Sequence, residues 1–165
     1  MERIEDGWVS VSATTREPRP AEEHGVHYFF LTEQEFDEIL AEDGFLEWAV
    51  VHDHRYGTLR SKVEEAMAAG KQVILEIDVQ GAMQVRKKMP DAHLVFIKPP
   101  SLEVLEQRLR GRGTEEEDVI IKRMKTAKLE LSYEKEYDIC FVNDNLEVAT
   151  NELVALVDSF AEEGE

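Results

Sequence analysis

Cysteine is almost absent from this chain of 165 residues, in which Cys140 is the only one. A single cysteine excludes an internal disulfide and is typical of proteins that stay in a reducing cytosol. The chain also lacks any apolar run near the roughly 20 residues that a membrane-spanning helix needs. Its first residues have neither the basic start nor the apolar stretch of a signal peptide. We therefore expect a cytoplasmic protein that does not bind membranes.

Basic side chains are scarce as well, with 19 Lys and Arg against 36 Asp and Glu and a formal net charge of −17. Such an excess argues against general binding to nucleic-acid backbones or anionic membranes, whose phosphates would be repelled. The content of 42% hydrophobic and 33% charged residues is that of a soluble globular protein, and 165 residues are enough for one domain with a single core. Any site for a phosphorylated ligand must therefore be a local group of basic residues in an acidic protein.

The chain shows no repeat, linker or break in composition that would divide it. Short apolar runs predict strands, and amphipathic stretches bounded by capping residues predict helices. Strands that alternate with helices indicate an α/β fold with a parallel sheet. The predicted strands cover about 8–12, 27–31, 45–51, 72–77, 93–97 and 137–142, and the predicted helices cover about 32–41, 58–70, 79–88, 101–109, 114–133 and 145 onward.

Capping residues set several of these boundaries. Thr32 with Glu35 and Thr114 with Glu117 have the spacing of capping boxes, and Thr58 is a candidate cap after the polar loop 52–55. The run 72–77 is typical of a parallel strand buried on both faces. The segment of about 10–58, with short strands and little helix, looks like an insertion packed against the sheet.

Two arginines, Arg16 and Arg19, lie three apart in a loop with prolines, directly after a predicted strand. Guanidinium groups at this spacing suit a phosphate, because each can donate paired hydrogen bonds. A surface loop with solvated arginines is the alternative.

A second basic cluster contains Arg108, Arg110, Arg112, Lys122 and Arg123, with Gly111 and Gly113 between its parts. A helix that ends in a basic, glycine-containing turn resembles a mobile lid that brings positive charge over a polyphosphate. An ordinary arginine-rich helix terminus is the alternative.

The predicted apolar strand at about 72–77 ends in two acidic residues, Glu76 and Asp78. Ligands of open α/β sheets bind beyond the carboxyl ends of the strands, where a carboxylate can hold Mg²⁺ through water or accept from a base. An acidic strand end without a ligand is the alternative. Glu47 could accept hydrogen bonds from N1 and the exocyclic N2 of guanine.

The histidines at 24, 27, 52 and 54 have no cysteine partner and do not make a convincing metal site. Cys140 is expected to be a small core residue.

Seven motifs in order resemble guanylate kinase, a nucleoside-monophosphate kinase, over nearly the whole chain from about Val9 to Leu156. The carriers are the segments 11–19 (VSATTREPR), 25–30 (GVHYFF), 45–49 (FLEWA), 56–58 (YGT), 75–81 (LEIDVQG), 108–114 (RLRGRGT) and 142–144 (VND). The resemblance implies a P-loop-kinase-like parallel sheet flanked by helices, a small mixed GMP-binding insertion at about 10–58 and a helical lid at about 108–123, all within one domain of residues 1–165.

The same resemblance implies a role for particular residues. GMP would be bound through its phosphate by Arg16, Arg19, Tyr28 and Tyr56, and through guanine by Ser12, Glu47, Thr58 and Asp78. Transfer of the γ-phosphate of ATP to GMP would be catalysed by Arg108, Arg112 and Arg123. Arg112 and Asn143 would contact ATP. Glu76 would hold, through bound water, the Mg²⁺ that accompanies ATP.

One expected part is missing from these residues. A kinase of this type has G-x-x-x-x-G-K-[ST] between a strand and a helix, whereas the only Gly-Lys, at 70–71, is followed by Gln72. We expect a truncated or late-start guanylate kinase that lacks its first strand and helix, in which Met1 is an internal methionine, with little or no activity. A non-catalytic module that binds GMP or a phosphopeptide is the alternative, and a folded remnant without a ligand is the third possibility.

Overall fold

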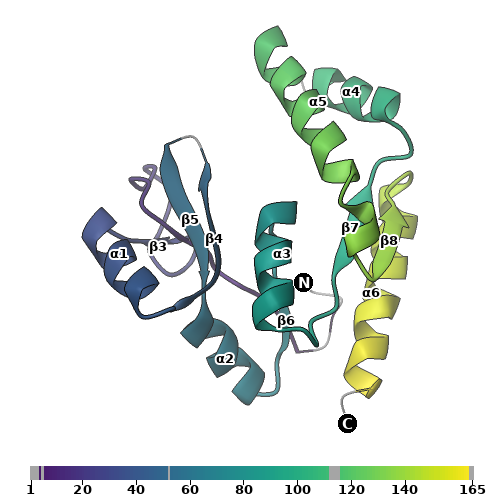
Figure 1. The fold of residues 1–165 in the computed structure, drawn as a ribbon. Coiled ribbons are helices and arrows are strands. Elements are labelled where there is room, and N and C mark those ends of the chain that lie inside the picture. Colours follow the sequence, from purple (N-terminus) through teal and green to yellow (C-terminus); the bar gives the residue numbers. More distant parts are fainter. Residues whose placement is uncertain (1–3, 5, 52, 112–115, 164–165) are drawn as a thin grey trace. The chain divides into compact units, whose positions relative to one another are not determined.

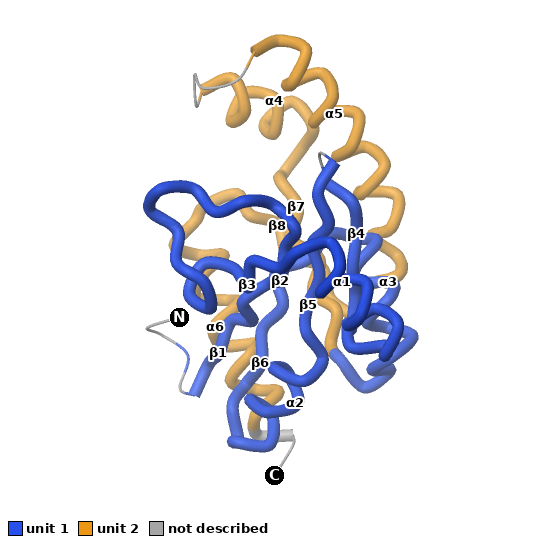
Figure 2. Tube along the Cα trace, turned by 90° about the vertical axis from the view of Figure 1, so that its left-hand side faces the viewer, with its two compact units in different colours: residues 1–92 blue, residues 93–165 orange. Residues whose placement is uncertain are grey.

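The computed structural model describes residues 4, 6–51, 53–111 and 116–163, in two compact units that comprise Met1–Ala92 and His93–Glu165. Figure 2 shows unit 1 in blue and unit 2 in orange. Each unit contains helices and strands, and each has parallel strand pairs. The predicted α/β class is therefore confirmed.

Unit 1 contains a mixed four-stranded sheet in the order β3-β2-β5-β4. Its strands are β2 (Ala13–Thr14), β3 (Phe29–Phe30), β4 (Phe45–Val51) and β5 (His54–Leu59). β2 pairs parallel with β3 and antiparallel with β5, which in turn pairs antiparallel with β4. The short central strand β2 thereby joins segments that lie far apart in the sequence.

Helix α1 (Glu33–Ala41) begins at the predicted capping box. The hydroxyl of Thr32 accepts from the backbone N–H of Glu35, and the Glu35 carboxylate accepts from the backbone N–H of Thr32. The helix lies beside the mixed sheet (Figure 1). It packs there through Phe36, whose ring stacks on Phe45 at 4.2 Å between centroids.

The structure corrects the prediction for residues 54–60. A loop was expected through Arg55, and Thr58 was expected to cap a helix, but β5 begins at His54 and Thr58 lies buried inside it. Helix α2 (Arg60–Ala68) instead has Leu59 at its N-cap without a side-chain cap. Pairing with β4 satisfies the backbone of this segment, and a buried β-branched residue fits a strand well.

A parallel pair, β1 (Gly7–Val9) and β6 (Gln72–Ile74), forms the rest of the unit 1 framework with helix α3 (Val79–Lys88). The boundaries of α3 are those predicted. β6 is shorter than predicted and only half-buried. The prediction of a strand over 72–77 that is buried on both faces is therefore wrong in both length and burial. A buried core of Leu46, Val63 and Val85 joins these elements to β4.

Unit 2 contains the parallel pair β7 (Val95–Lys98) and β8 (Ile139–Val142), a 3₁₀ turn at Glu134–Glu136 and three helices. The helices are α4 (Leu102–Gly111), α5 (Glu117–Leu131) and α6 (Leu146–Glu163). The Ser101 hydroxyl accepts from the N–H of Val104 at 3.2 Å and so caps the start of α4.

Two predictions for unit 2 need comment. α5 begins at Glu117 with Glu116 at its N-cap, and Thr114, the predicted cap, lies outside the described residues. Cys140 is exposed rather than part of a core, because alternate residues of β8 face solvent. Helices in the described parts of the chain lack the combination of length and apolar character that crossing a membrane requires.

Candidate functional site

Arg16, directly after β2, is held by an acidic partner. Its Nη2 donates to both carboxylate oxygens of Glu22, at 2.9 and 3.0 Å, and its Nη1 donates to the carbonyl of Glu17 at 2.7 Å. The Arg16 and Glu22 side chains are each 15% exposed. Hydrogen bonds from Arg16 and from the backbone N–H of Arg19 lower the pKa of Glu22, and the Glu22 carboxylate raises the pKa of Arg16. The guanidinium is thus fixed in a defined position.

Two tyrosines lie beside this guanidinium. The Arg16 Cζ is 5.4 Å from the centre of the Tyr28 ring, and the Tyr28 and Tyr56 rings meet edge to face at 6.0 Å. A hydrogen bond with Tyr56 also contributes to the raised pKa of Arg16. The sheet explains this meeting, because β2 pairs with β3, next to Tyr28, and with β5, in register Thr14 to Tyr56. Three of the four predicted phosphate-binding residues are therefore brought together.

The other predicted residues of this region are Arg19 and Ser12. Arg19 is exposed, and its backbone N–H donates to Glu22 at 2.8 Å, so the same carboxylate fixes both arginine positions of the loop. Ser12 is half-buried, and its carbonyl accepts from the N–H of Phe29 at 2.9 Å. Both residues lie on the segment that flanks β2.

A second group of polar residues gathers around Glu47, which is only 7% exposed. Its Oε1 accepts from the buried hydroxyl of Thr58 at 2.7 Å, because β4 and β5 place these two residues opposite each other. Burial is the main cause that raises the pKa of Glu47, and the nearby charge of Asp78 raises it further, while the Thr58 hydroxyl lowers it. Both the hydroxyl and the backbone of Thr58 contribute hydrogen bonds to Glu47, and a carboxyl with about four lone-pair positions has others left for a ligand.

Asp78 reaches this group from the start of α3. Its side chain caps the helix and accepts from the N–H of Gly81 at 2.8 Å. Asp78 and Glu76 are exposed and lie in the extended connection after β6, at the carboxyl end of that strand. Glu47, Thr58 and Asp78, three of the four residues predicted to bind guanine, thus lie close together.

The predicted ATP-binding and catalytic residues lie in unit 2. Arg108 donates through Nη1 to the carbonyl of Asn143 at 2.7 Å and through Nη2 to that of Asp144 at 2.9 Å. The end of α4 and the loop after β8 are therefore joined at two predicted positions. Arg123 is exposed on α5, and Arg112 lies outside the described residues.

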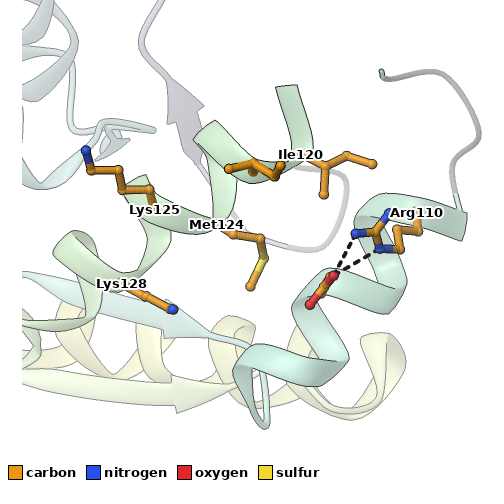
Figure 3. A pocket seen from close by; sticks show the side chains of 7 residues that line it. Arg110, Ile120, Met124, Lys125 and Lys128 are labelled. Carbon is orange, nitrogen blue, oxygen red and sulfur yellow. Dashed lines mark hydrogen bonds and ion pairs between the residues drawn. The ribbon is translucent and has the colours of Figure 1, made fainter. Parts of the chain in front are cut away.

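Arg110, in the basic cluster but without an assigned role, links α4 to α5. It donates to Glu106 at 2.8 Å and forms an ion pair with Glu117. Beside it is an open pocket of about 340 Å³, which Figure 3 shows with Met124, Lys125 and Lys128. Arg110 and Glu117 lie seven positions apart in the sequence. Their pairing between α4 and α5 was therefore visible only once the helix boundaries were known.

Sequence reasoning also missed Glu22 and Gln84. Gln84 holds the backbone of Trp48 from both sides, accepting from its N–H at 3.2 Å and donating to its carbonyl at 2.9 Å. The contact fixes α3 against β4 next to Glu47. Glu22 stands three residues after Arg19, a spacing that is a usable signal, whereas nothing near Gln84 in the sequence indicates its partner. Among the described residues, no three His, Cys, Asp or Glu side chains gather as a metal site.

Comparison with known proteins yields a family model, guanylate kinase, that matches residues 2–160. The chain belongs to the guanylate kinase family. Guanylate kinase of Streptomyces coelicolor is 54% identical over 149 residues, which are 90% of this chain and 76% of that protein. Guanylate kinase of Escherichia coli is 50% identical over 152 residues, which are 92% of this chain and 73% of that protein.

A solved structure supports the same assignment. The crystal structure of guanylate kinase from Anaplasma phagocytophilum matches with a TM-score of 0.75 at 29% identity, over 97% of this chain and 78% of that one. The resemblance inferred from the seven motifs is therefore confirmed at the level of family and fold.

Proposed function

We propose that unit 1 binds GMP and that the residues of unit 2 serve the transfer of the γ-phosphate of ATP to it, giving ADP and GDP, the reaction of guanylate kinases. One observation carries the assignment to this substrate. Glu47 is a buried carboxyl, positioned by Thr58 and lying near Asp78. Guanine offers an N1–H and an exocyclic amine to such acceptors. Adenine has no N1–H, so it would leave a buried acid unpaired at a large cost.

The phosphate of GMP would take the place prepared by Arg16, Arg19, Tyr28 and Tyr56. The meeting of Arg16 with both tyrosines supports this assignment, because a guanidinium and two phenolic hydroxyls are all donors suited to phosphate oxygens. Ser12, from the neighbouring segment before β2, would complete the binding of guanine. The two ends of the nucleotide would then lie on β2, β4 and β5 of one sheet.

On the ATP side, we assign Arg108, Arg112 and Arg123 to stabilising the phosphoryl group during transfer and Arg112 with Asn143 to contacts with ATP. Phosphoryl transfer depends on positioning and charge neutralisation rather than on a protein nucleophile. Mg²⁺ bound with ATP supplies further neutralisation of phosphate charge. Glu76 is an exposed carboxylate at the carboxyl end of a parallel strand and fits a role in holding the metal's waters.

The proposed partners are these two nucleotides rather than nucleic acid or membranes, in keeping with the net charge of −17. A cytoplasmic location stays a prediction that rests on the single cysteine, Cys140.

The sequence of 165 residues contains no G-x-x-x-x-G-K-[ST] loop for the phosphates of ATP. Gly70 and Lys71 lie in the turn between α2 and β6, and Lys71 forms an ion pair with Asp6. Their place after a helix and before a strand is the reverse of what a phosphate loop needs. We therefore infer that these residues alone retain GMP binding but transfer phosphate poorly.

A module that binds a phosphopeptide would use the arginine and the tyrosines but would have no need of Glu47. Substitution of Glu47 by Ala separates the two functions. Weaker but measurable GMP binding by E47A supports the nucleotide site. Binding of a phosphopeptide by both the unchanged chain and E47A, with no GMP binding by the unchanged chain, would support the module.

The decisive measurement is the melting temperature with and without GMP. A ligand that binds only the folded state stabilises it by about 2.7 kcal/mol at a hundredfold excess over its Kd. We expect a clear increase for the unchanged chain and no increase for Arg16→Ala. Arg110→Ala is the matched control, because Arg110 is also paired with acids but lies on α4, and it should keep the full increase. Absence of a shift for the unchanged chain at saturating nucleotide contradicts the proposal.

A further inference from the structure

Gly81, in the first turn of α3, is packed directly against the carboxyl group of Glu47. A Cβ atom at this position would lie 2.8 Å from Glu47 Oε2, 3.2 Å from Cδ and 3.3 Å from Cγ. Carbon atoms do not approach a carboxylate so closely without displacement. The missing side chain of Gly81 is therefore the space that the Glu47 carboxyl occupies.

The surrounding contacts leave Glu47 as the group that would have to move. Gln84, one turn further along α3, holds both the N–H and the carbonyl of Trp48, so β4 is fixed to the helix next to Glu47. The N–H of Gly81 donates to Asp78 at 2.8 Å and fixes the start of the helix. The end of the Glu47 side chain, which Thr58 holds by a hydrogen bond, is then the part that an added methyl group would displace.

We propose that Gly81 is a positioning residue that sets the specificity for guanine, an inference that rests on the proposed GMP site. Its N–H orients Asp78, and its lack of a side chain allows Glu47 to turn toward Thr58 and the ligand. One glycine thus fixes the separation of the two acids that accept from the base. It does not itself touch the nucleotide.

The test is Gly81→Ala, with Gln80→Ala as the matched control. Gln80 is the exposed neighbour in the same turn, so its truncation puts no atom near Glu47. Alanine is a better helix former than glycine, and the clash is with a flexible side-chain end, so G81A should melt at or above the temperature of the unchanged chain. Titration calorimetry should show at least about tenfold weaker GMP binding for G81A, the loss expected when a hydrogen bond to a charged group is broken. Q80A should bind GMP as the unchanged chain does.

Specificity distinguishes this role from a merely structural one. Inosine monophosphate lacks the exocyclic amine of guanine, so it makes fewer hydrogen bonds to the two acids than GMP does. G81A should therefore weaken GMP binding more and reduce the preference for GMP over inosine monophosphate. In an E47A background, Gly81→Ala should change GMP affinity by less than about twofold, because the group through which it acts is gone. The double variant also has room for the methyl group and should fold even where G81A does not.

Each contrary result has a definite meaning. If G81A binds GMP as tightly as the unchanged chain, or if its effect persists in full in E47A, the inference is wrong and the proposed function stands. If the unchanged chain binds no GMP, the proposed function fails and the inference fails with it.

Discussion

A buried carboxyl such as Glu47 makes the stability of the protein depend on pH in an unusual direction. Burial raises its pKa above the ordinary value of 4.5, so protonation is easier in the folded state than in the unfolded one. Its contribution to the free energy of unfolding is then fully present below pH 4.5 and is lost as the pH rises through the raised pKa. Glu47→Gln removes this loss, because an amide does not titrate.

We therefore expect the melting temperature of E47Q, relative to that of the unchanged chain, to increase with pH across this window and then level off. Glu22→Gln provides a control of opposite sign, because Arg16 lowers the pKa of Glu22. The stability that Glu22 contributes is present above 4.5 and is lost as the pH falls through its lowered pKa. Thermal melts from about pH 2 to 8 measure both differences, since the window of Glu22 lies below pH 4.5 and that of Glu47 lies above it. A constant difference for E47Q over this range contradicts the assignment of a raised pKa.

At the scale of elements, the capping box of α1 predicts a local cost. Thr32→Ala removes the hydroxyl that accepts from the N–H of Glu35, which should lower the free energy of unfolding by about 1 kcal/mol. Gln34→Ala, in the same exposed helix, should change it by less than about 0.5 kcal/mol. Urea denaturation measures both values.

The cost of Thr32→Ala should also depend on pH. The backbone and side chain of Thr32 lower the pKa of Glu35, so the box stabilises fully above pH 4.5 and weakens as the pH falls through the lowered pKa of that residue. An equal loss of stability in T32A and Q34A would show that the box does not hold this helix.

The elements that could be predicted from the sequence are those specified by neighbouring residues. Thr32 and Glu35 are three apart, and the boundaries of α3 follow from its own pattern, so both predictions were correct. β5 was missed because its strand character depends on pairing with β4, which the polar residues 52–55 concealed. Long-range pairing overrides local propensity in such segments.

The same distinction applies to the site. The arginine loop and Glu47 belong to short motifs and were predicted by number, and the structure places Arg16 with both tyrosines and Glu47 with Thr58. The roles of Gly81 and Gln84 depend on β4, more than thirty positions earlier in the chain, through contacts that have no local pattern. The sequence alone therefore could not predict these two roles, which became visible only in the packing of α3 against β4.

At the scale of the whole molecule, the missing phosphate loop predicts the balance between binding and catalysis. We expect the 165 residues to show the GMP-dependent stabilisation described above but little or no turnover of ATP and GMP, because their sequence contains no G-x-x-x-x-G-K-[ST] motif for the ATP phosphates. A coupled assay for ADP measures turnover, with Escherichia coli guanylate kinase as the positive control. Robust turnover would mean that another element of the chain replaces the loop.

Arg16 holds a carboxylate before any phosphate arrives. A guanidinium matched by Glu22 adds little net field, so in a protein of charge −17 the proposed phosphate site need not be a bare cationic patch. A singly charged anion such as chloride offers Arg16 no more than Glu22 already provides. A phosphate dianion offers more charge and more acceptor atoms, and it can displace the carboxylate or share the arginine with it. Glu22 thus competes with any anion for Arg16, and this competition favours a doubly charged ligand over a singly charged one.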